Sequence, residues 1–353
     1  MTAHHPAESS NRFTSLLGID VPVVLGPFGG VSSVALTAAV SDGGGLGSFG
    51  LYGYDAAAIQ KTAAQLREAT AKPFALNLWV PTGSEIDALP TEDFERYTAT
   101  LKPYFDELGL PYPEMPDRYM PDHGEQVEAA LEARPAVVSF VFGVPGPNVV
   151  EEAHRRGIKV VGTATTAAEA VALEAGGVDA VVATGMEAGG HRVSFLKPAE
   201  ESLVGTFALV PQVADAVSVP VIAAGGIADR RGFAAAMALG ADAVQVGTAF
   251  LATRESAAVP AYREVLHSPA ASHTVLTRAL SGRLARGIPN RIIAELEETG
   301  EVAPFPVQNW LTGRFRPQAA AQGNTDLMSL WAGQSAPLLR HHTAAEVLAE
   351  LLA

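Results

Sequence analysis

His191 is the residue whose type and setting point most directly to chemistry. It follows Glu187, Ala188 and two glycines, Gly189 and Gly190, on a loop after a short apolar run. Glycines have no Cβ and let a backbone approach a flat ligand closely, and histidine suits proton transfer near neutral pH. The segment therefore predicts a catalytic histidine beside a bound ligand. Glu187 either orients His191 or caps the loop, and the sequence leaves both roles open.

Two glycine-containing pairs could hold a phosphate group. Gly225-Gly226 ends one apolar run shortly before Asp229, a residue typical of helix starts, and Gly247-Thr248 ends the next run. Backbone N–H groups at such positions favour a phosphate. The alternative is that the glycines only form tight turns. Neither segment matches the Gly-x-Gly-x-x-Gly or Walker patterns, so a Rossmann site or an NTPase is not indicated.

Asn77 is a polar residue within an apolar run, and a buried amide must find a hydrogen-bond partner. That partner is either the edge of a cofactor or the protein backbone. Ser33 fits a helix cap better than a nucleophile. His123 and His154 lie in no motif, and no cluster of three ligands at sensible spacing indicates a metal site.

The elements that position these residues alternate between strands and helices. Eight short apolar runs predict buried parallel strands, and helical patterns fill most of the gaps. The predicted strands are 21–25, 46–49, 74–80, 136–142, 159–162, 180–183, 219–224 and 243–246. The predicted helices are 33–41, 56–69, 149–156, 167–175, 207–216 and 230–239. Eight such units predict an α/β fold, the TIM (β/α)8 barrel, with the active site at the C-terminal ends of the strands.

Two long segments interrupt this alternation. Residues 81–134 are acidic and rich in proline, which predicts a rim insertion or lid. Residues 257–326 predict a small helical cap domain on the substrate side, inserted after strand eight, with no strand. Its predicted helices are 261–266, 274–279 and 292–298. Residues 327–333 and 344–352 are expected to close the barrel, which then comprises 1–256 and 327–353.

The composition excludes several classes of protein. The net charge of −14, from 24 basic and 38 acidic residues, argues against binding to nucleic acid or to an anionic membrane surface. The absence of cysteine excludes thiolate catalysis, thiolate-bound zinc, iron–sulfur clusters and a cysteinyl link to a flavin. Residues 1–12 lack the apolar core of a signal peptide, and no apolar run reaches membrane length. A cytoplasmic protein is therefore expected.

Nine segments, taken together, resemble the nitronate monooxygenases, flavin-dependent TIM barrels formerly called 2-nitropropane dioxygenases. They occur in order over nearly the whole chain: 26–31, 43–47, 73–77, 139–143, 162–165, 187–191, 223–227, 245–248 and 331–334. The resemblance implies non-covalent FMN and His191 as the catalytic residue. The flavin-binding residues expected on this basis are Gly26, Phe28, Asn77, Thr184, Gly189, Gly190, Ala224, Gly225, Gly226, Gln245, Val246, Gly247, Thr248 and Gln334.

Two positions depart from the pattern of that family. The chain has Gly26-Pro27-Phe28 where the family often has Ala-Pro-Met, and Thr184 where the family commonly has glutamine. The first change alters what packs against the flavin, and the second shortens a flavin contact. Both bear on the identity of the substrate more than on that of the cofactor.

The resemblance implies that an alkyl nitronate, or its parent nitroalkane, is oxidised by O2 to a carbonyl compound and nitrite. The expected partners are these small molecules, and the acidic surface is compatible with a monomer or a homodimer. Three alternatives stay open. They are an NAD(P)H-dependent enoyl-thioester reductase with the same glycine loops, a non-flavin barrel that binds a phosphorylated ligand, and a flavin-binding protein without turnover.

Overall fold

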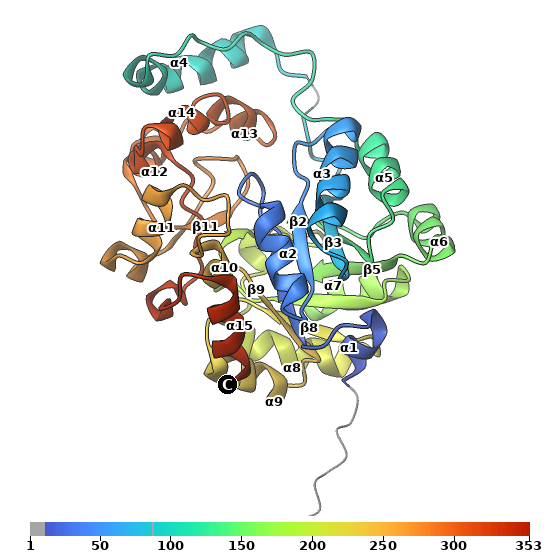
Figure 1. Cartoon of the computed structure of the whole chain (residues 1–353). Coiled ribbons are helices and arrows are strands. Elements are labelled where there is room, and N and C mark those ends of the chain that lie inside the picture. The colour runs from blue at the N-terminus through green and yellow to red at the C-terminus, as the bar shows by residue number, and fades with distance from the viewer. Residues whose placement is uncertain (1–10, 87) are drawn as a thin grey trace, which may run out of the picture.

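Eight parallel strands form a closed barrel in the computed structural model, which describes residues 11–86 and 88–353 (Figure 1). The hydrogen-bonded order is β1-β9-β8-β6-β5-β4-β3-β2. The barrel closes between its first two strands, where the Leu25 N–H donates to Leu46 O and the Leu46 N–H donates to Val23 O, both at 2.9 Å. The predicted TIM barrel is therefore confirmed. Its strands are β1 (Val23–Leu25), β2 (Gly47–Gly50), β3 (Phe74–Trp79), β4 (Val137–Val141), β5 (Lys159–Ala164), β6 (Ala180–Thr184), β8 (Val221–Ala224) and β9 (Ala243–Val246).

A layer of helices covers the outside of the barrel. Polar side chains at their first turns fix where several of them begin: Ser33 accepts from the Leu36 N–H, and Asp229 accepts from the N–H groups of Arg231 and Gly232. Such caps satisfy N–H groups that have no partner within the helix. The helices are α2 (Val34–Asp42), α3 (Ala56–Ala69), α5 (His123–Glu132), α6 (Pro147–Arg155), α7 (Ala167–Ala175), α8 (Thr206–Ala216), α9 (Arg230–Ala238) and α15 (Ala344–Leu352).

The barrel interior is filled at the N-terminal ends of the strands. Val137, Ala180 and Ala243, the first residues of their strands, pack in one cluster with Phe13. Phe13 lies on the short helix α1 (Arg12–Leu17) and is fully buried. Because this end is plugged with apolar side chains, ligands can approach only at the opposite, C-terminal mouth.

The segment predicted as a lid divides between two cores. Helix α4 (Thr91–Leu108) buries Phe94, Leu101 and Phe105 in a second hydrophobic cluster, together with the residues that follow β9. Helix α5, in contrast, packs against α3 in the barrel layer. Figure 1 shows α4 lying across α13 and α14, away from the barrel helices. Within residues 81–134, only the part before α5 therefore leaves the barrel.

The cap after β9 contains helices and a small sheet. Its helices are α10 (Thr248–Leu251), α11 (Pro260–Leu266), α12 (Arg291–Thr299), α13 (Val307–Thr312) and α14 (Arg316–Ala321). The predicted helix at 274–279 and the predicted lack of strands are wrong. Residues Val275–Thr277 form strand β10, which pairs in antiparallel fashion with β11 (Ala285–Gly287). The β-branched Val275 and Thr277 suit an extended strand, and the pairing with β11 decides the outcome.

The chain leaves the cap later than expected. Leu327, Met328 and Leu330 are buried in the cap cluster, and Trp331 forms an isolated antiparallel bridge with Gly287. Only α15 rejoins the barrel layer, where it contacts α2 and α9. Residues 331–334 are thus held at the mouth of the barrel and not in its wall. In the described part of the chain, no helix is long and apolar enough to span a membrane.

Candidate active site

His191 lies at the mouth of the barrel, on a two-residue strand that joins the barrel to the cap. This strand, β7 (Gly190–His191), follows the loop after β6 and pairs in antiparallel fashion with β11, where His191 lies opposite Ala285. Strands β10, β11 and β7 form one sheet. The position of the imidazole is therefore set by two segments that are far apart in the sequence.

Ser281 determines which nitrogen of His191 carries the proton. The Ser281 Oγ lies 2.9 Å from His191 Nε2 and donates its own proton to Arg283 O at 3.0 Å. Since a hydroxyl has one proton, Nε2 must be the donor to Ser281. The hydrogen-bond pattern therefore assigns the Nε2–H tautomer and leaves the lone pair on Nδ1.

The surroundings of His191 keep it neutral. Burial lowers the pKa of His191 to about 3, and the positive charges of Arg283 and Arg316 act in the same direction. The residue as a whole is half-buried. At neutral pH the side chain is therefore an uncharged imidazole that can accept a proton.

Glu187 caps a helix and does not orient His191. Both of its carboxylate oxygens accept from the Thr206 N–H, at 3.0 and 2.9 Å, and Oε2 also accepts from Thr206 Oγ1 at 2.9 Å. Thr206 is the first residue of α8. The role of orienting His191 is therefore not seen, and the carboxylate instead caps the first turn of α8.

Two buried arginines hold the loop between β6 and His191. The Arg192 guanidinium donates to Gly185 O at 2.7 Å and to Thr184 O at 3.0 Å, and Arg286 Nε donates to Met186 O at 2.8 Å. Charge-assisted bonds of this kind are stronger than neutral ones. Sequence reasoning missed both arginines, because nothing local indicates that they are buried.

The predicted phosphate site has unused donors. Among the described residues, no hydrogen bond is made by the N–H groups of Gly225, Gly226, Gly247 or Thr248. Gly225 and Gly226 have φ of 100° and 74°, a conformation that only glycine adopts readily. All four residues are at least partly exposed. Free N–H groups on irregular backbone beside a helix start favour an anion.

The segment from 331 to 334 completes this end of the mouth. The Gly333 N–H donates to Thr248 Oγ1 and the Gln334 N–H donates to Glu187 O, both at 2.9 Å. A Cβ on Gly189 would lie 2.6 Å from the backbone of Ala332, so the loop and this segment are in direct contact. The exposed Gln334 is therefore brought to the loop that carries His191.

The remaining predicted residues line the ends of the strands. Thr184 pairs in register with Ala224, and Ala224 pairs with Gln245. The Gly26 N–H donates to Val246 O at 2.9 Å, and the Phe28 ring reaches to 3.7 Å from the position of a Cβ on Gly247.

Asn77 uses only half of its amide within the protein. Its Nδ2 donates to Ser139 Oγ at 3.0 Å and to Ser139 O at 3.2 Å. Among the described residues, no hydrogen bond to its Oδ1 is formed. Asn77 is 4% exposed. The partner of the amide nitrogen is therefore a neighbouring strand, and the carbonyl oxygen stays available to a ligand.

Comparisons with known proteins agree with this geometry. The family model described as nitronate monooxygenase matches residues 10–353. The chain is 38% identical over 346 residues to the probable nitronate monooxygenases of Staphylococcus aureus strains JH9 and N315, covering 98% of this chain and 97% of theirs.

This chain belongs to the nitronate monooxygenase family. It is a flavin-dependent oxidoreductase, and solved structures agree. A nitroalkane oxidase from Streptomyces ansochromogenes is 37% identical, with a TM-score of 0.84 over 97% of this chain and 98% of that one. FabK from Thermotoga maritima is also similar, at 31% identity and a TM-score of 0.74 over 97% of this chain and 94% of that one.

In this nitronate monooxygenase, aromatic rings that sequence reasoning missed form a wall beside His191. The Trp79 ring centroid is 5.0 Å from that of His191 and 4.7 Å from that of Phe142, and Trp331 lies at 5.6 Å from His191. Phe142 has φ of 70°, which is rare for a bulky residue and is found mostly where structure serves function. The available signal for Trp79 and Phe142 was their position at the C-terminal ends of the predicted strands 74–80 and 136–142.

A cavity of about 440 Å³ adjoins this wall. It lies between the end of β3, the loops on either side of α4, and the cap. Its lining includes Trp79, Glu85, Tyr119, His123 and Arg283. His123 was set aside in the sequence because it lies in no motif, and the other four were not singled out.

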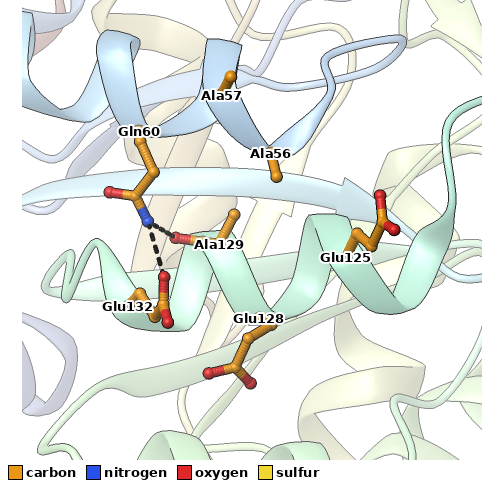
Figure 2. Close-up of a pocket in the computed structure, with 7 residues that line it drawn as sticks. All are labelled: Ala56, Ala57, Gln60, Glu125, Glu128, Ala129 and Glu132. Carbon is orange, nitrogen blue, oxygen red and sulfur yellow. Dashed lines mark hydrogen bonds between the residues drawn. The ribbon is translucent and has the colours of Figure 1, made fainter.

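A second hollow lies on the outer face of the barrel. Figure 2 shows it between α3 and α5, where Gln60 Nε2 donates to Ala129 O at 2.9 Å and to Glu132 Oε2 at 3.4 Å. Glu125 and Glu128 lie at the same groove. It shares no residue with the mouth of the barrel and is a gap between two packed helices.

Proposed function

We propose that this nitronate monooxygenase uses FMN, bound across the mouth with its phosphate at Gly225-Gly226 and Gly247-Thr248. The free N–H groups of these residues support an anion at this place, as does their convergence at the ends of β8 and β9. Asn77, with its available carbonyl oxygen, is proposed to contact the flavin edge. The residues present fit the cofactor.

The flavin, when bound, accepts electrons from the nitronate and supplies the reaction with O2 that yields a carbonyl compound and nitrite. The protein's own part is to hold both reactants and to manage the proton. We propose residues 257–326, against which α4 packs, as the substrate side of the site, because β11 in this segment pairs with the strand that carries His191.

His191 is the proposed general base. Its neutral imidazole has the lone pair on Nδ1, since Nε2 donates to Ser281. For a neutral nitroalkane, Nδ1 would take the α-proton and so generate the nitronate. A nitronate added as substrate has already lost this proton and needs no base. The neutral histidine at the same mouth as the anion-binding glycines is the observation that carries the proposal.

The test is the absorption spectrum of the purified protein, followed by anaerobic addition of propyl-1-nitronate and, separately, of NADPH. We expect a flavin spectrum that the nitronate changes and NADPH does not, and release of FMN on denaturation. Rapid bleaching by NADPH alone would instead favour the enoyl-thioester reductase. A protein that takes up no flavin after FMN addition would refute the proposal.

A further inference from the structure

Arg283 keeps hydrogen-bond donors free near His191. Within the described part of the chain only its Nη2 is used, which donates to Thr82 Oγ1 at 3.1 Å and to Glu85 Oε1. Its Nε and Nη1 make no hydrogen bond to described residues, and neither atom is fully enclosed by the protein. Arg283 also lines the cavity beside Trp79. These N–H groups are therefore open to a ligand.

The guanidinium of Arg283 is held in a fixed position. It lies over the Phe305 ring at 3.9 Å and over the Phe142 ring at 4.3 Å, and it forms an ion pair with Glu85. A stacked guanidinium presents its donors in a rigid plane. The ring centroids of Phe142 and His191 are 6.3 Å apart. Arg283 is therefore a preorganised donor in the neighbourhood of the proposed base.

Tyr52 has a hydroxyl proton that no described residue accepts. Arg316 Nη2 donates to Asn309 Oδ1 at 2.8 Å, and since a guanidinium can only donate, this bond fixes Oδ1 as the acceptor. Asn309 Nδ2 therefore donates to Tyr52 Oη, at 2.7 Å. The hydroxyl is the acceptor in that bond and keeps its own proton for another partner. Burial raises the pKa of Tyr52, so this proton is present at neutral pH.

The two donors and the proposed base surround one aromatic ring. The ring centroid of Trp79 is 4.4 Å from that of Tyr52 and 5.0 Å from that of His191. The guanidinium carbon of Arg283 is 5.9 Å from the same Trp79 ring. The positive charges of Arg283 and Arg316 act on both the hydroxyl and the imidazole. Two free donors and one neutral base are therefore neighbours at the mouth of the barrel.

We propose that Arg283 and Tyr52 bind the nitro group of the substrate, each donating a hydrogen bond to one of its oxygens. The proposal rests on the proposed function, in which His191 takes the α-proton. When Nδ1 takes this proton, the electron pair of the C–H bond forms a C=N bond, and negative charge moves onto the nitro oxygens. Donors fixed at these oxygens stabilise the charge as it develops.

The test uses 2-methyl-2-nitropropane, which carries a nitro group but no α-hydrogen and so cannot be turned over. Its Kd for the holoenzyme is measured by saturation-transfer NMR on the tert-butyl signal. Tyr52→Phe should raise this Kd roughly three- to tenfold, as expected for one neutral hydrogen bond. Arg283→Lys keeps the charge and the pairing with Glu85 but loses the planar set of donors, and should raise the Kd about tenfold or more. An unchanged Kd in either variant would overturn the proposal.

Tyr54→Phe and Arg291→Lys are the matched controls. Tyr54 lies two residues beyond Tyr52, but its ring packs edge-to-face on Phe49 in the core between the barrel strands and their helices. Arg291 joins the cap to α4 by an ion pair with Glu107 and does not line the cavity. Both control variants should bind 2-methyl-2-nitropropane with the Kd of the wild type.

A second titration shows whether the two donors serve the cofactor instead. The apoproteins of Tyr52→Phe and Arg283→Lys should bind FMN with the Kd of the wild type. Weaker binding of FMN would assign the donors to the flavin and overturn the proposal.

The binding data also separate this inference from the proposed function. If the protein oxidises no nitronate but both variants bind 2-methyl-2-nitropropane more weakly, the proposed function fails and the site for the nitro group stands. If nitronates are oxidised and both variants bind this compound as the wild type does, only the assignment of Arg283 and Tyr52 fails.

Discussion

At the scale of single residues, the chemistry of His191 is set by its neighbours. The hydrogen bond to Ser281 orients the ring, and burial with two nearby arginines holds the imidazole neutral. A histidine in water would be partly protonated near pH 6.5. In the folded protein, the imidazole of His191 stays unprotonated at neutral and mildly acid pH, so it can act as a base there.

Replacement of His191 by asparagine tests the proposed base. We expect turnover of neutral nitroalkanes to fall by about 10²–10⁴-fold, the usual contribution of general base catalysis. Turnover of preformed nitronates should change far less, because they need no deprotonation. The flavin content, read from the absorption spectrum, serves as the control. Equal losses on both substrates would argue for a role in binding and against a role as base.

The lowered pKa of His191 also predicts how stability depends on pH. Between pH 6.5 and 3 the unfolded chain binds a proton at this residue and the folded chain does not, so stability falls as the pH falls. From pH 7 to pH 5 this one residue should remove about 2 kcal/mol from the free energy of unfolding. Urea denaturation of the wild type and of His191→Asn at both pH values measures it. The variant should lose less stability than the wild type, and parallel losses would contradict the assigned shift.

At the scale of elements, the ends of neighbouring strands gather groups that are distant in the sequence. The ends of β8 and β9 supply the free N–H groups, and the loop after β6 supplies His191. The segment 331–334 reaches the same place from the cap through two backbone hydrogen bonds. The rigid barrel strands therefore fix the positions of the functional groups, which lie on the short segments that follow these strands.

Substitution of Gly226 by alanine tests the phosphate site. The φ of 74° makes alanine unfavourable there by about 1 kcal/mol, and the new methyl group would lie on the backbone that we propose to bind the phosphate. We expect FMN affinity to fall roughly tenfold, the loss of one hydrogen bond to a charged group. Fluorescence titration of the apoprotein with FMN gives the Kd.

Gly157→Ala is the matched control for this variant. Gly157 has φ of 77°, and a Cβ there would contact nothing within 4 Å. It lies between α6 and β5, next to the N-terminal end of that strand and therefore away from the mouth. It should therefore lose similar stability and keep the FMN affinity of the wild type. Equal affinities for both variants would argue against the phosphate site.

At the scale of the whole molecule, the two largest hydrophobic cores lie apart from the cluster that fills the barrel interior. One lies between the barrel strands and their helices, and the other unites α4 with the cap. The proposed flavin site lies on the barrel, whereas the cavity beside Trp79 lies between barrel, lid segment and cap. The stability of the cap should therefore affect substrate selection more than cofactor binding.

Phe105→Ala tests this division. Phe105 is 1% exposed and packs edge-to-face on Phe315 at 5.3 Å, so its truncation should cost about 3–5 kcal/mol. We expect hydrogen exchange to accelerate in α4 and α12–α14, while the barrel strands stay protected and flavin remains bound. Leu173→Ala, in the barrel core, should accelerate hydrogen exchange in the barrel and leave α4 and α12–α14 protected. If both variants lost protection against hydrogen exchange equally in the barrel and in the cap, the two parts would unfold as one cooperative unit and the prediction would be wrong.

Much of the barrel, and the strand ends at which we propose the cofactor, were predictable from local sequence. Strands such as 180–183 and 219–224 are continuous apolar runs, because parallel strands are buried on both faces. The glycines at 225, 226 and 247 mark the positions where strands end and the backbone must turn. These signals are local, so they can be recognised in the sequence without knowledge of the fold.

The substrate side was decided by tertiary structure alone. Within the predicted helix 274–279, residues 275–277 form a strand because they pair with β11, and His191 forms a hydrogen bond with Ser281, 90 residues away in the sequence. Glu85, Tyr119 and Arg283 carry no motif, and only the packing of lid and cap around Trp79 gives them a common cavity. The sequence by itself determined the barrel and the glycine-containing strand ends at which we propose that the ligand binds, since both follow from short-range patterns of polarity and glycine. The protonation state of His191 and the shape of the cavity depend on burial and on long-range contacts, and these exist only in the folded chain.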